Sequence, residues 1–322
     1  MNVIGAIIAK RVGLGLFTLF VISLLVFFAI QLLPGDPASA ILGQGATPEA
    51  LASFRHELGL DQTPLIRYLA WASGLLHGDP GHSLANGRLV ADLIGERLGN
   101  TVYLAAVSTA IAMPIGVALG VMATLMRGRV WDSITSTLSL VTISFPEFFI
   151  AYILVAVFSV SLGWLPAVAF AEAGQTGWQR FANVALPAIT LSLTVIAYVM
   201  RMTRAALMNV MAAPYIEMAQ LKGTRPFAIV VRHALPNALA PIINVVLLNL
   251  AYLIVGVVVV EVVFVYPGLG QLLVDSVSKR DLPVVQACCM IFAAVYVLLN
   301  LTADILAILS NPRLRRPRRT AA

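Results

Sequence analysis

Three acidic residues lie inside long apolar runs of the sequence, and they are the first candidates for chemistry. Glu147 follows Pro146 in "SFPEFF", Glu261 lies in "VVVVEVVFVYPGLG", and Asp304 lies in the last apolar run. A charged side chain at membrane depth costs roughly 2.5–3.5 kcal/mol, so it usually faces a cavity or pairs with another group. Two roles remain open for Glu147 and Glu261: lining a polar translocation path, and forming a hydrogen bond between helices. Pro146 is expected to bend the chain beside Glu147, and it is a further candidate for the path. For Asp304 we favour a structural role.

Common catalytic motifs are absent from the sequence. It contains no GxxxxGK[ST] phosphate-binding loop, no HExxH zinc motif and no GxSxG nucleophile elbow. His77 and His82 could supply at most half of a four-ligand metal site. Cys288 and Cys289 are adjacent within an apolar run, which is typical of packing residues. We therefore expect a non-catalytic chain that holds no metal and no cofactor of its own.

The amino-acid composition indicates whether the chain lies in water or in a membrane. Of the 322 residues, 60% are hydrophobic and 11% are charged, whereas a soluble domain carries about 25% charged residues. So much apolar surface cannot be hidden in a water-soluble core, and the lipid bilayer is the expected environment. The first apolar run is too long for a signal-peptide core, so we interpret it as a retained first span.

Apolar windows define the membrane-spanning elements. A transmembrane helix needs about 20 apolar residues. Six windows qualify, and we expect an all-α polytopic membrane protein with six transmembrane helices. The windows cover residues 12–33, 101–126, 134–160, 186–200, 239–265 and 284–309. The expected organisation is an N-terminus with first helix (1–33), an extracytoplasmic loop domain (34–100), a five-helix core (101–309) with a cytoplasmic segment (212–238), and a basic tail (310–322).

The basic residues indicate the orientation of these spans. Six spans place both termini on one side, where 14 of the 21 Lys and Arg residues also fall. Four of the other seven lie in the long first loop, which the positive-inside rule largely ignores. Both termini are therefore expected on the cytoplasmic side of the membrane, which the family resemblance described below implies to be a bacterial inner membrane. The formal charge of +6 then reflects topology and contact with anionic lipid, not nucleic-acid binding.

The outer loop, residues 34–100, is the largest soluble segment. Thr47 can cap a helix that begins at Pro48 and stops at Gly59. The next stretch, "TPLIRYLAWASGLLHGDPGHSL", is amphipathic and ends in turn residues. Two roles remain open for this loop: a cap that stabilises the spans, and a docking surface or gate for a partner.

The cytoplasmic segment "PYIEMAQLKGTRPFAIVVRHALPNALAP" is polar between two apolar runs. Pro214 suits the start of a short helix, in which Glu217 and Lys222 complement the helix dipole. Gly223 then favours a left-handed stop. The chain resumes as a second helix at Pro226. We expect a projecting elbow that another protein could grip.

The second helix of this segment has its own apolar stripe and an expected end. Its apolar residues recur at helical spacing on one face. They are Phe227, Val230, Val231, Ala234 and Leu235. Pro236 is expected to end the helix before the fifth span begins.

These residues resemble a family signature. Glu217, Met218 and Ala219, then Gly223, then Leu235-Pro236 resemble the "EAA…G…I-LP" pattern of ABC importer permeases, with Met218 in place of the first alanine and His233 in place of the isoleucine. Other stretches, in order, are similar to the dipeptide/oligopeptide/nickel permease family, and to the first of its two paired permeases. They are "LPGDPA", "LGLDQTPLIRYLAWASGLLHGDPGHSL", "VMRMTRAALMNVM", "YPGLGQLLVDSVSKRDLPVVQ" and "NPRLRR".

The resemblance implies a type I ABC importer permease fold and a set of partners. These are a second homologous permease, two cytoplasmic ATPase subunits that carry ATP and Mg²⁺, and an extracytoplasmic substrate-binding protein. The implied ATPase-coupling residues are Tyr215, Glu217, Met218, Ala219, Lys222, Gly223, Thr224 and Arg225. The candidates for docking the binding protein are Asp79, His82, Arg280 and Asp281.

The leading hypothesis is a permease subunit that imports dipeptides or oligopeptides. Nickel chelates, glutathione and other small solutes are alternatives within the family, because the binding protein usually selects the substrate. A different class of function would be an independent proton-coupled carrier that uses Glu147 and Glu261. Six spans without an evident internal repeat argue against that carrier.

Overall fold

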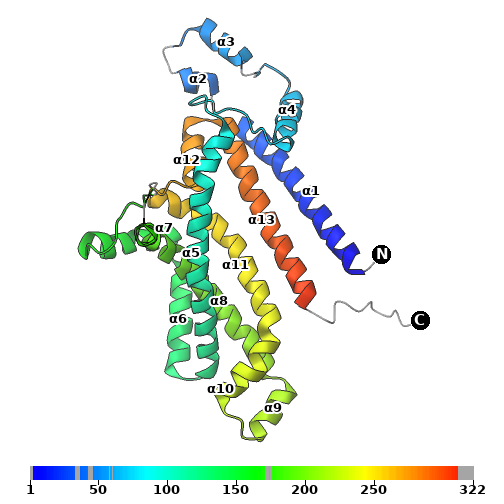
Figure 1. The fold of residues 1–322 in the computed structure, drawn as a ribbon, viewed down its shortest axis with the longest axis vertical. Helices are drawn as coiled ribbons and strands as arrows, with labels where there is room; N and C mark the ends of the chain where they lie inside the picture. Colours follow the sequence, from blue (N-terminus) through cyan, green and yellow to red (C-terminus); the bar gives the residue numbers. More distant parts are fainter. Residues whose placement is uncertain are drawn as a thin grey trace.

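The computed structural model describes residues 3–32, 37–42, 46–57, 59, 61–170, 174 and 176–310. Within these ranges the chain is helical, and its only β-type pairing is an isolated bridge between His82 and Leu89. The helices form an elongated bundle with short helices at both ends (Figure 1). The fold is therefore all-α, as the sequence predicts.

Five helices of the described chain are long and apolar enough to cross a membrane, and a bent pair supplies a sixth crossing if it counts as one span. The five are α1 (Val3–Gln31), α5 (Val90–Leu125), α8 (Gly177–Met211), α11 (Leu235–Val263) and α13 (Leu282–Ser310). The bent pair is α6 (Val130–Ser144) with α7 (Glu147–Leu154) and its π-helical continuation η1 (Val155–Ser161). This agrees with the six predicted windows.

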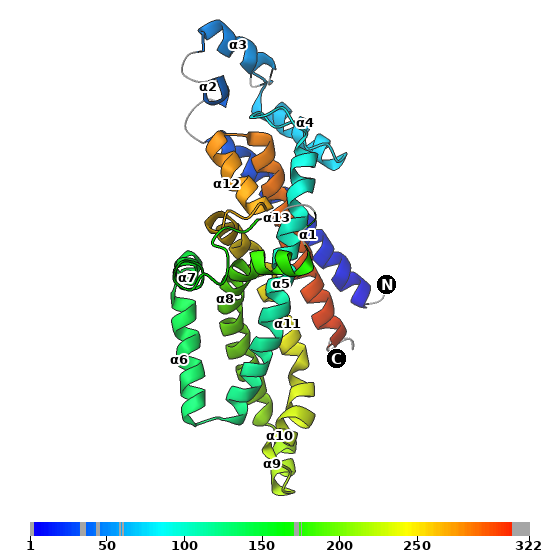
Figure 2. The same ribbon diagram turned by 60° about the vertical axis from the view of Figure 1, so that its left-hand side comes forward.

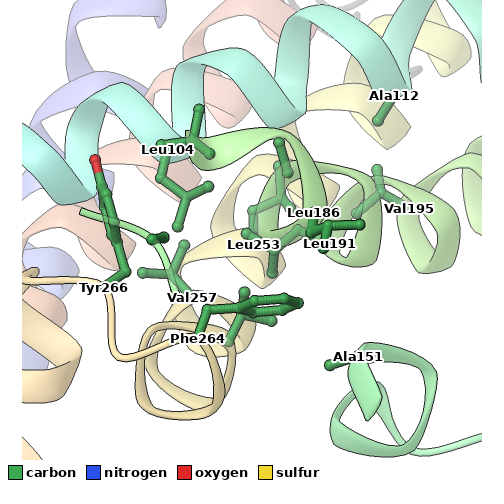
Figure 3. Close-up of a cluster of buried hydrophobic side chains, with 14 of the residues drawn as sticks. Leu104, Ala112, Ala151, Leu186, Leu191, Val195, Leu253, Val257, Phe264 and Tyr266 are labelled. Atoms are coloured by element: carbon green, nitrogen blue, oxygen red, sulfur yellow. The ribbon is translucent and has the colours of Figure 1, made fainter. Parts of the chain in front are cut away.

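Helix α8 is the centre of the bundle. It packs along α5 and also against α11. Gly116 and Gly120 of α5 allow the closest approach, because an added Cβ would lie 2.8 Å from Val199 Cβ and 2.7 Å from Thr203 Cβ on α8. Small residues at such crossings bring helix backbones together. Figure 3 shows the main cluster of buried side chains that α5, α8 and α11 form, including Leu104, Leu191 and Val257.

The second span begins earlier than expected. The sequence places it at residue 101, whereas α5 begins at Val90. Its first turns are held by packing, since Val90, Leu93 and Ile94 are buried in a cluster with Leu269 of α12 (Leu269–Lys279) and with Val284 near the start of α13. The last ten residues or so of the predicted outer loop are therefore part of this helix.

The third span is broken at Pro146. Helices α6 and α7 meet at an angle of 104°. Phe145 is extended (φ −88°, ψ 136°), as the residue before a proline usually is. Figure 2 shows α6 running alongside α8 while α7 turns away from that direction. The predicted bend is confirmed, and it is sharp enough to redirect the chain.

Pro236 does not end a helix, and that prediction is wrong. The short α10 (Pro226–Ala228) continues through the π-helical η2 (Ile229–Ala234) into α11, so that one helical rod runs over Pro226–Val263. Pro236 comes two residues after the π turn ends, and such a turn already shifts the i→i−4 hydrogen bonds that a proline would break. The π turn also rotates the buried face, which leaves Phe227 65% exposed while Ile229 and Val230 are buried.

The outer segment contains α2 (Pro37–Leu42), α3 (Pro48–Glu57) and α4 (Pro64–Leu76). The Ala50 N–H donates to Thr47 Oγ1 at 3.3 Å, and Gly59 has φ +63°, so the predicted cap and stop are confirmed. The sequence also places Leu51, Phe54 and Leu58 on one face of this helix, but Leu58 lies outside the described residues and the Phe54 side chain is not described.

Helix α4 is fastened to the first span. Tyr68 is buried beside Phe27 of α1, with ring centroids 5.4 Å apart, and its hydroxyl lies 2.9 Å from Ser23 Oγ. Trp71 adds a second ring contact to Phe27. The start of α1 and the end of α13 point toward the end of the bundle that carries α9 (Pro214–Leu221), away from α2, α3 and α4 (Figure 1).

Candidate functional site

Helix α9 (Pro214–Leu221) projects from one end of the bundle (Figures 1 and 2). Pro214 lies in its first turn, as the sequence predicts. Ile216 is fully buried and anchors the helix to the body of the protein. Its cluster also contains Leu207, Ile229, Val230, Ala234, Ala238 and Ile242. Helix α9 is therefore packed against α8 and η2 and is not connected to the bundle by a loop alone.

Gly223 ends α9 in the predicted left-handed conformation, with φ +77°. The Gly223 N–H donates to the Gln220 carbonyl at 2.9 Å, and the Thr224 N–H donates to the Ala219 carbonyl at 3.2 Å. This pair of bonds is a Schellman motif. An added Cβ at Gly223 would meet no atom within 4 Å, so the backbone torsion alone requires glycine here.

Most of the predicted coupling residues share one exposed surface. Tyr215, Glu217, Met218, Lys222, Gly223 and Arg225 are exposed, whereas Ala219 and Thr224 are partly buried. Sequence reasoning missed Leu221 and Phe227, which are 76% and 65% exposed. Leu221 could have been found, because it lies one turn after Met218 on the helix face opposite Ile216.

An ion pair fixes α8 close to this projection. Arg204 of α8 donates through Nε and Nη2 to the two carboxylate oxygens of Asp132, at 2.8 and 2.9 Å. The Gly128 N–H also donates to Asp132, at 3.2 Å. Leu207, about one turn after Arg204, belongs to the cluster that buries Ile216. One end of α8 is thus held to both the α5–α6 turn and α9.

Glu261 is enclosed in a hydrogen-bonded network. Its side chain is 0% exposed. Thr101 Oγ1 donates to Oε1 at 2.7 Å, and the N–H groups of Gly270 and Gln271 donate to Oε2 at 2.6 and 3.2 Å. Gly270 and Gln271 lie in the first turn of α12 (Leu269–Lys279), so Glu261 caps that helix from α11. Of the two roles that the sequence leaves open for Glu261, this environment agrees with the hydrogen bond between helices.

Glu147 has a different environment. It is the first residue of α7, directly after Pro146, and it is only partly buried. An added Cβ at Gly256 of α11 would lie 2.7 Å from Glu147 Oε2, so the carboxylate rests against that glycine. In the part of the chain that the structure describes, the Glu147 carboxylate has no hydrogen-bond or ion-pair partner. Its role in a translocation path stays a prediction.

Asp304 forms an ion pair, which agrees with the structural role that the sequence favours. Its Oδ2 lies 2.9 Å from Arg11 Nη1, and the pair joins α13 to α1. Both side chains are more than a third exposed, so the pair orients two helices more than it stabilises them.

The four candidates for docking a binding protein are not equivalent. Asp281 is buried and accepts hydrogen bonds from Ser83 Oγ and from the Leu84 N–H, the latter at 3.0 Å. A partner cannot contact it directly, so its assignment as a contact residue is corrected: it holds the turn around Ser83 against the start of α13. Asp79 and His82 are exposed, and Arg280 is partly buried at the end of α12.

A cavity of about 470 Å³ lies at the end of the bundle that carries α4, next to these residues. Its lining includes Trp71 of α4, Asp79, and Gln286 of α13. Among the described residues, no three His, Cys, Asp or Glu side chains converge on a point that could hold a metal ion. This end of the bundle therefore offers a recess between α4 and the start of α13, with both polar and apolar lining.

The family models match nearly the whole chain. Residues 116–316 match "Binding-protein-dependent transport system inner membrane component", and residues 6–105 match "Binding-prot-dependent transport system membrane comp, N-term". The chain belongs to this family of transport components. It is a multi-pass inner-membrane permease subunit of a binding-protein-dependent ABC importer.

Relatives of this permease subunit cover almost its full length. It is 36% identical over 311 residues to the "Probable peptide ABC transporter permease protein y4tP" of Sinorhizobium fredii, covering 97% of this chain and 99% of the relative. It is 40% identical over 298 residues to the glutathione transport system permease protein GsiC of Escherichia coli K12, covering 92% and 95%.

A solved structure supports the permease fold. A chain of the MetNI methionine ABC transporter, crystallised in inward-facing conformations, superposes with a TM-score of 0.55 at 18% identity, covering 68% of this chain and 96% of that one. At this identity the likeness concerns the fold alone. It confirms the expected importer-permease architecture.

Proposed function

We propose that this permease subunit imports short peptides, paired with a second, similar permease and driven by two cytoplasmic ATPase subunits. The relatives named for peptide transport support the substrate class. Glutathione, itself a modified tripeptide, is the second candidate, because a permease named for it is 40% identical. ATP and Mg²⁺ belong to the partner subunits in this proposal.

The coupling role is supported mainly by the two different faces of α9. Its outer surface is exposed and mixed apolar and charged, while Ile216 on the opposite face is fully buried. A helix gripped on one face and packed on the other can transmit force. The cluster around Ile216 and the Arg204–Asp132 ion pair would carry the displacement into α8 and the α5–α6 turn.

The orientation follows the same proposal. The end that carries α9, toward which the start of α1 and the end of α13 point (Figure 1), faces the cytoplasm, and the end that carries α2, α3 and α4 faces outward. The binding protein would approach the recess near Trp71 through Asp79, His82 and Arg280, whose side chains are at least partly accessible. Asp281 would act indirectly, by holding this surface in place.

The coupling role is tested by two substitutions at Gly223 in the assembled complex, in proteoliposomes. Gly223→Val forces a β-branched residue into φ +77°, where L-residues are strained by roughly 1–2 kcal/mol. Gly223→Asn is the matched control, because asparagine tolerates this region. We expect the valine variant to assemble but to import less trialanine per ATP hydrolysed, and the asparagine variant to stay near the wild type.

Two outcomes would contradict the proposal. If the valine variant imports trialanine and hydrolyses ATP as the wild type does, the elbow does not couple the two activities. If the purified chain alone takes up peptide along a pH gradient without any ATPase, the proton-coupled carrier is the better description.

A further inference from the structure

Two tyrosines stand beside the unpaired carboxylate of Glu147. Tyr252 lies one turn before Gly256 on α11, on the face that Glu147 touches. Tyr198 of α8 packs against Tyr252, with ring centroids 6.0 Å apart. Helix α7, which carries Glu147, packs against both α8 and α11. Three helices that are distant in sequence thus bring one carboxylate and two phenol rings together.

The exposure of these residues is unusual for their helices. Between residues 184 and 200 of α8, Tyr198 is the one exposed residue, at 36%. Tyr252 is 43% exposed on α11. Within the described chain neither tyrosine hydroxyl has a hydrogen-bond partner. The two hydroxyls are therefore accessible polar groups on α8 and α11 without a hydrogen-bond partner in the described chain.

We propose that Glu147, Tyr198 and Tyr252 form a binding site for a primary or quaternary ammonium group in the translocation path. The ammonium group would be the amino terminus of a transported peptide, so the biological ligand rests on the proposed function. An unpaired carboxylate at membrane depth attracts a cation, and aromatic ring faces add cation–π attraction. An anion would be repelled, and an apolar ligand would leave the carboxylate unsatisfied.

Gly256 gives the site its space. An added Cβ there would reach 2.7 Å from one Glu147 oxygen and 3.0 Å from the other. A side chain at this position would displace the carboxylate. The glycine thus lets Glu147 rest against α11, one turn from Tyr252.

The test uses a charged thiol probe in the full transporter complex. Cys288 and Cys289 are replaced by alanine, and Tyr252→Cys supplies one reporter thiol. The rates of modification by trimethylammonium-ethyl and by sulfonato-ethyl methanethiosulfonate are compared, with Glu147 present and with Glu147→Gln. We expect the cationic reagent to be favoured, and the preference to fall about tenfold in the glutamine variant, as loss of a nearby charge predicts.

A matched control lies on the same helix face. Leu248→Cys is one turn before position 252, is 47% exposed in the native chain, and lies about 12 Å along the helix from Gly256. Its charge preference should not depend on Glu147. In addition, n-butylammonium should slow modification at position 252 with Glu147 intact, and butyrate should not, which tests the site without the Glu147 variant.

The site is overturned if the thiol at position 252 reacts with neither reagent, if the two reagents react alike with Glu147 present, or if n-butylammonium gives no protection. Uptake of trialanine separates this inference from the proposed function. If the Tyr252→Cys reporter shows the cation preference while the wild-type complex imports no trialanine, the site stands and the peptide substrate is rejected. If the wild-type complex imports trialanine while the reporter shows no cation preference, the site is rejected and the proposed function stands.

Discussion

Glu261 and Glu147 are both single glutamates in apolar helices, yet their surroundings are opposite. Glu261 is enclosed and accepts hydrogen bonds from Thr101, Gly270 and Gln271. Glu147 is partly exposed and has no such partner in the described chain. The two glutamates differ in how they relate to the start of a helix. Glu261 of α11 accepts hydrogen bonds from the first turn of another helix, α12, whereas Glu147 is itself the first residue of α7. A membrane-depth carboxylate can therefore fix a helix or remain available for a ligand.

The glycines around the two carboxylates show the same contrast. A Cβ at Gly268 would overlap the whole Glu261 carboxylate, and one at Gly270 would lie 2.5 Å from the Val258 backbone. At Gly256 the nearest atom is the tip of the Glu147 side chain. The first site is closed on every side, and the second has room to rearrange.

The largest expected effect is that of Glu261→Ala. It leaves Thr101 and two backbone N–H groups without an acceptor in a buried site, and each unsatisfied buried donor costs about 1–3 kcal/mol. We expect a loss of roughly 3 kcal/mol or more in the free energy of unfolding, or failure to accumulate in the membrane. Thermal unfolding of the purified complex measures it. Glu147→Ala is the control, and equal losses in both variants would remove the contrast.

Gly268→Ala should have the next largest effect. Gly268 has φ −110°, so alanine is not strained there and the overlap with Glu261 is the only cost. Overpacking of this kind costs typically 1–3 kcal/mol. Gly256→Ala should cost less, because the Glu147 side chain can move. The two melting temperatures, measured on the same complex, decide whether the second site is looser than the first.

Thr101→Val tests the middle of the Glu261 network. Thr101 Oγ1 donates to Glu261 and accepts the Leu269 N–H at 2.8 Å, so an isosteric valine should cost about 1–3 kcal/mol. Thr194→Val is the matched control, because the Thr194 hydroxyl is buried without a partner. That change should be neutral or stabilising. Equal destabilisation by the two changes would show that the Thr101 hydrogen bonds contribute nothing.

The sequence predicts the spans, the elbow and the family, because each depends on local patterns of hydropathy, proline and glycine. Gly223 and Pro146 behave as their residue types require. Pro236 does not, because a π turn before it absorbs the distortion, and no local pattern reports that. The two glutamates look alike in sequence, because Thr101, which donates to Glu261, lies 160 residues away, and the glycine that Glu147 rests against lies on a different helix. Tertiary contacts decide such roles.

The smallest effect on stability is expected for Glu147→Gln, and that is what makes it informative. The carboxylate has no hydrogen bond to lose, and removing an unpaired charge from membrane depth relieves a desolvation cost. The melting temperature should therefore stay the same or rise slightly, while the cation preference at position 252 falls. A marked drop in melting temperature would show that Glu147 stabilises the bundle as Glu261 does. Glu147 and Glu261 would then share one structural role, and the proposed ammonium site would have no unpaired carboxylate to support it.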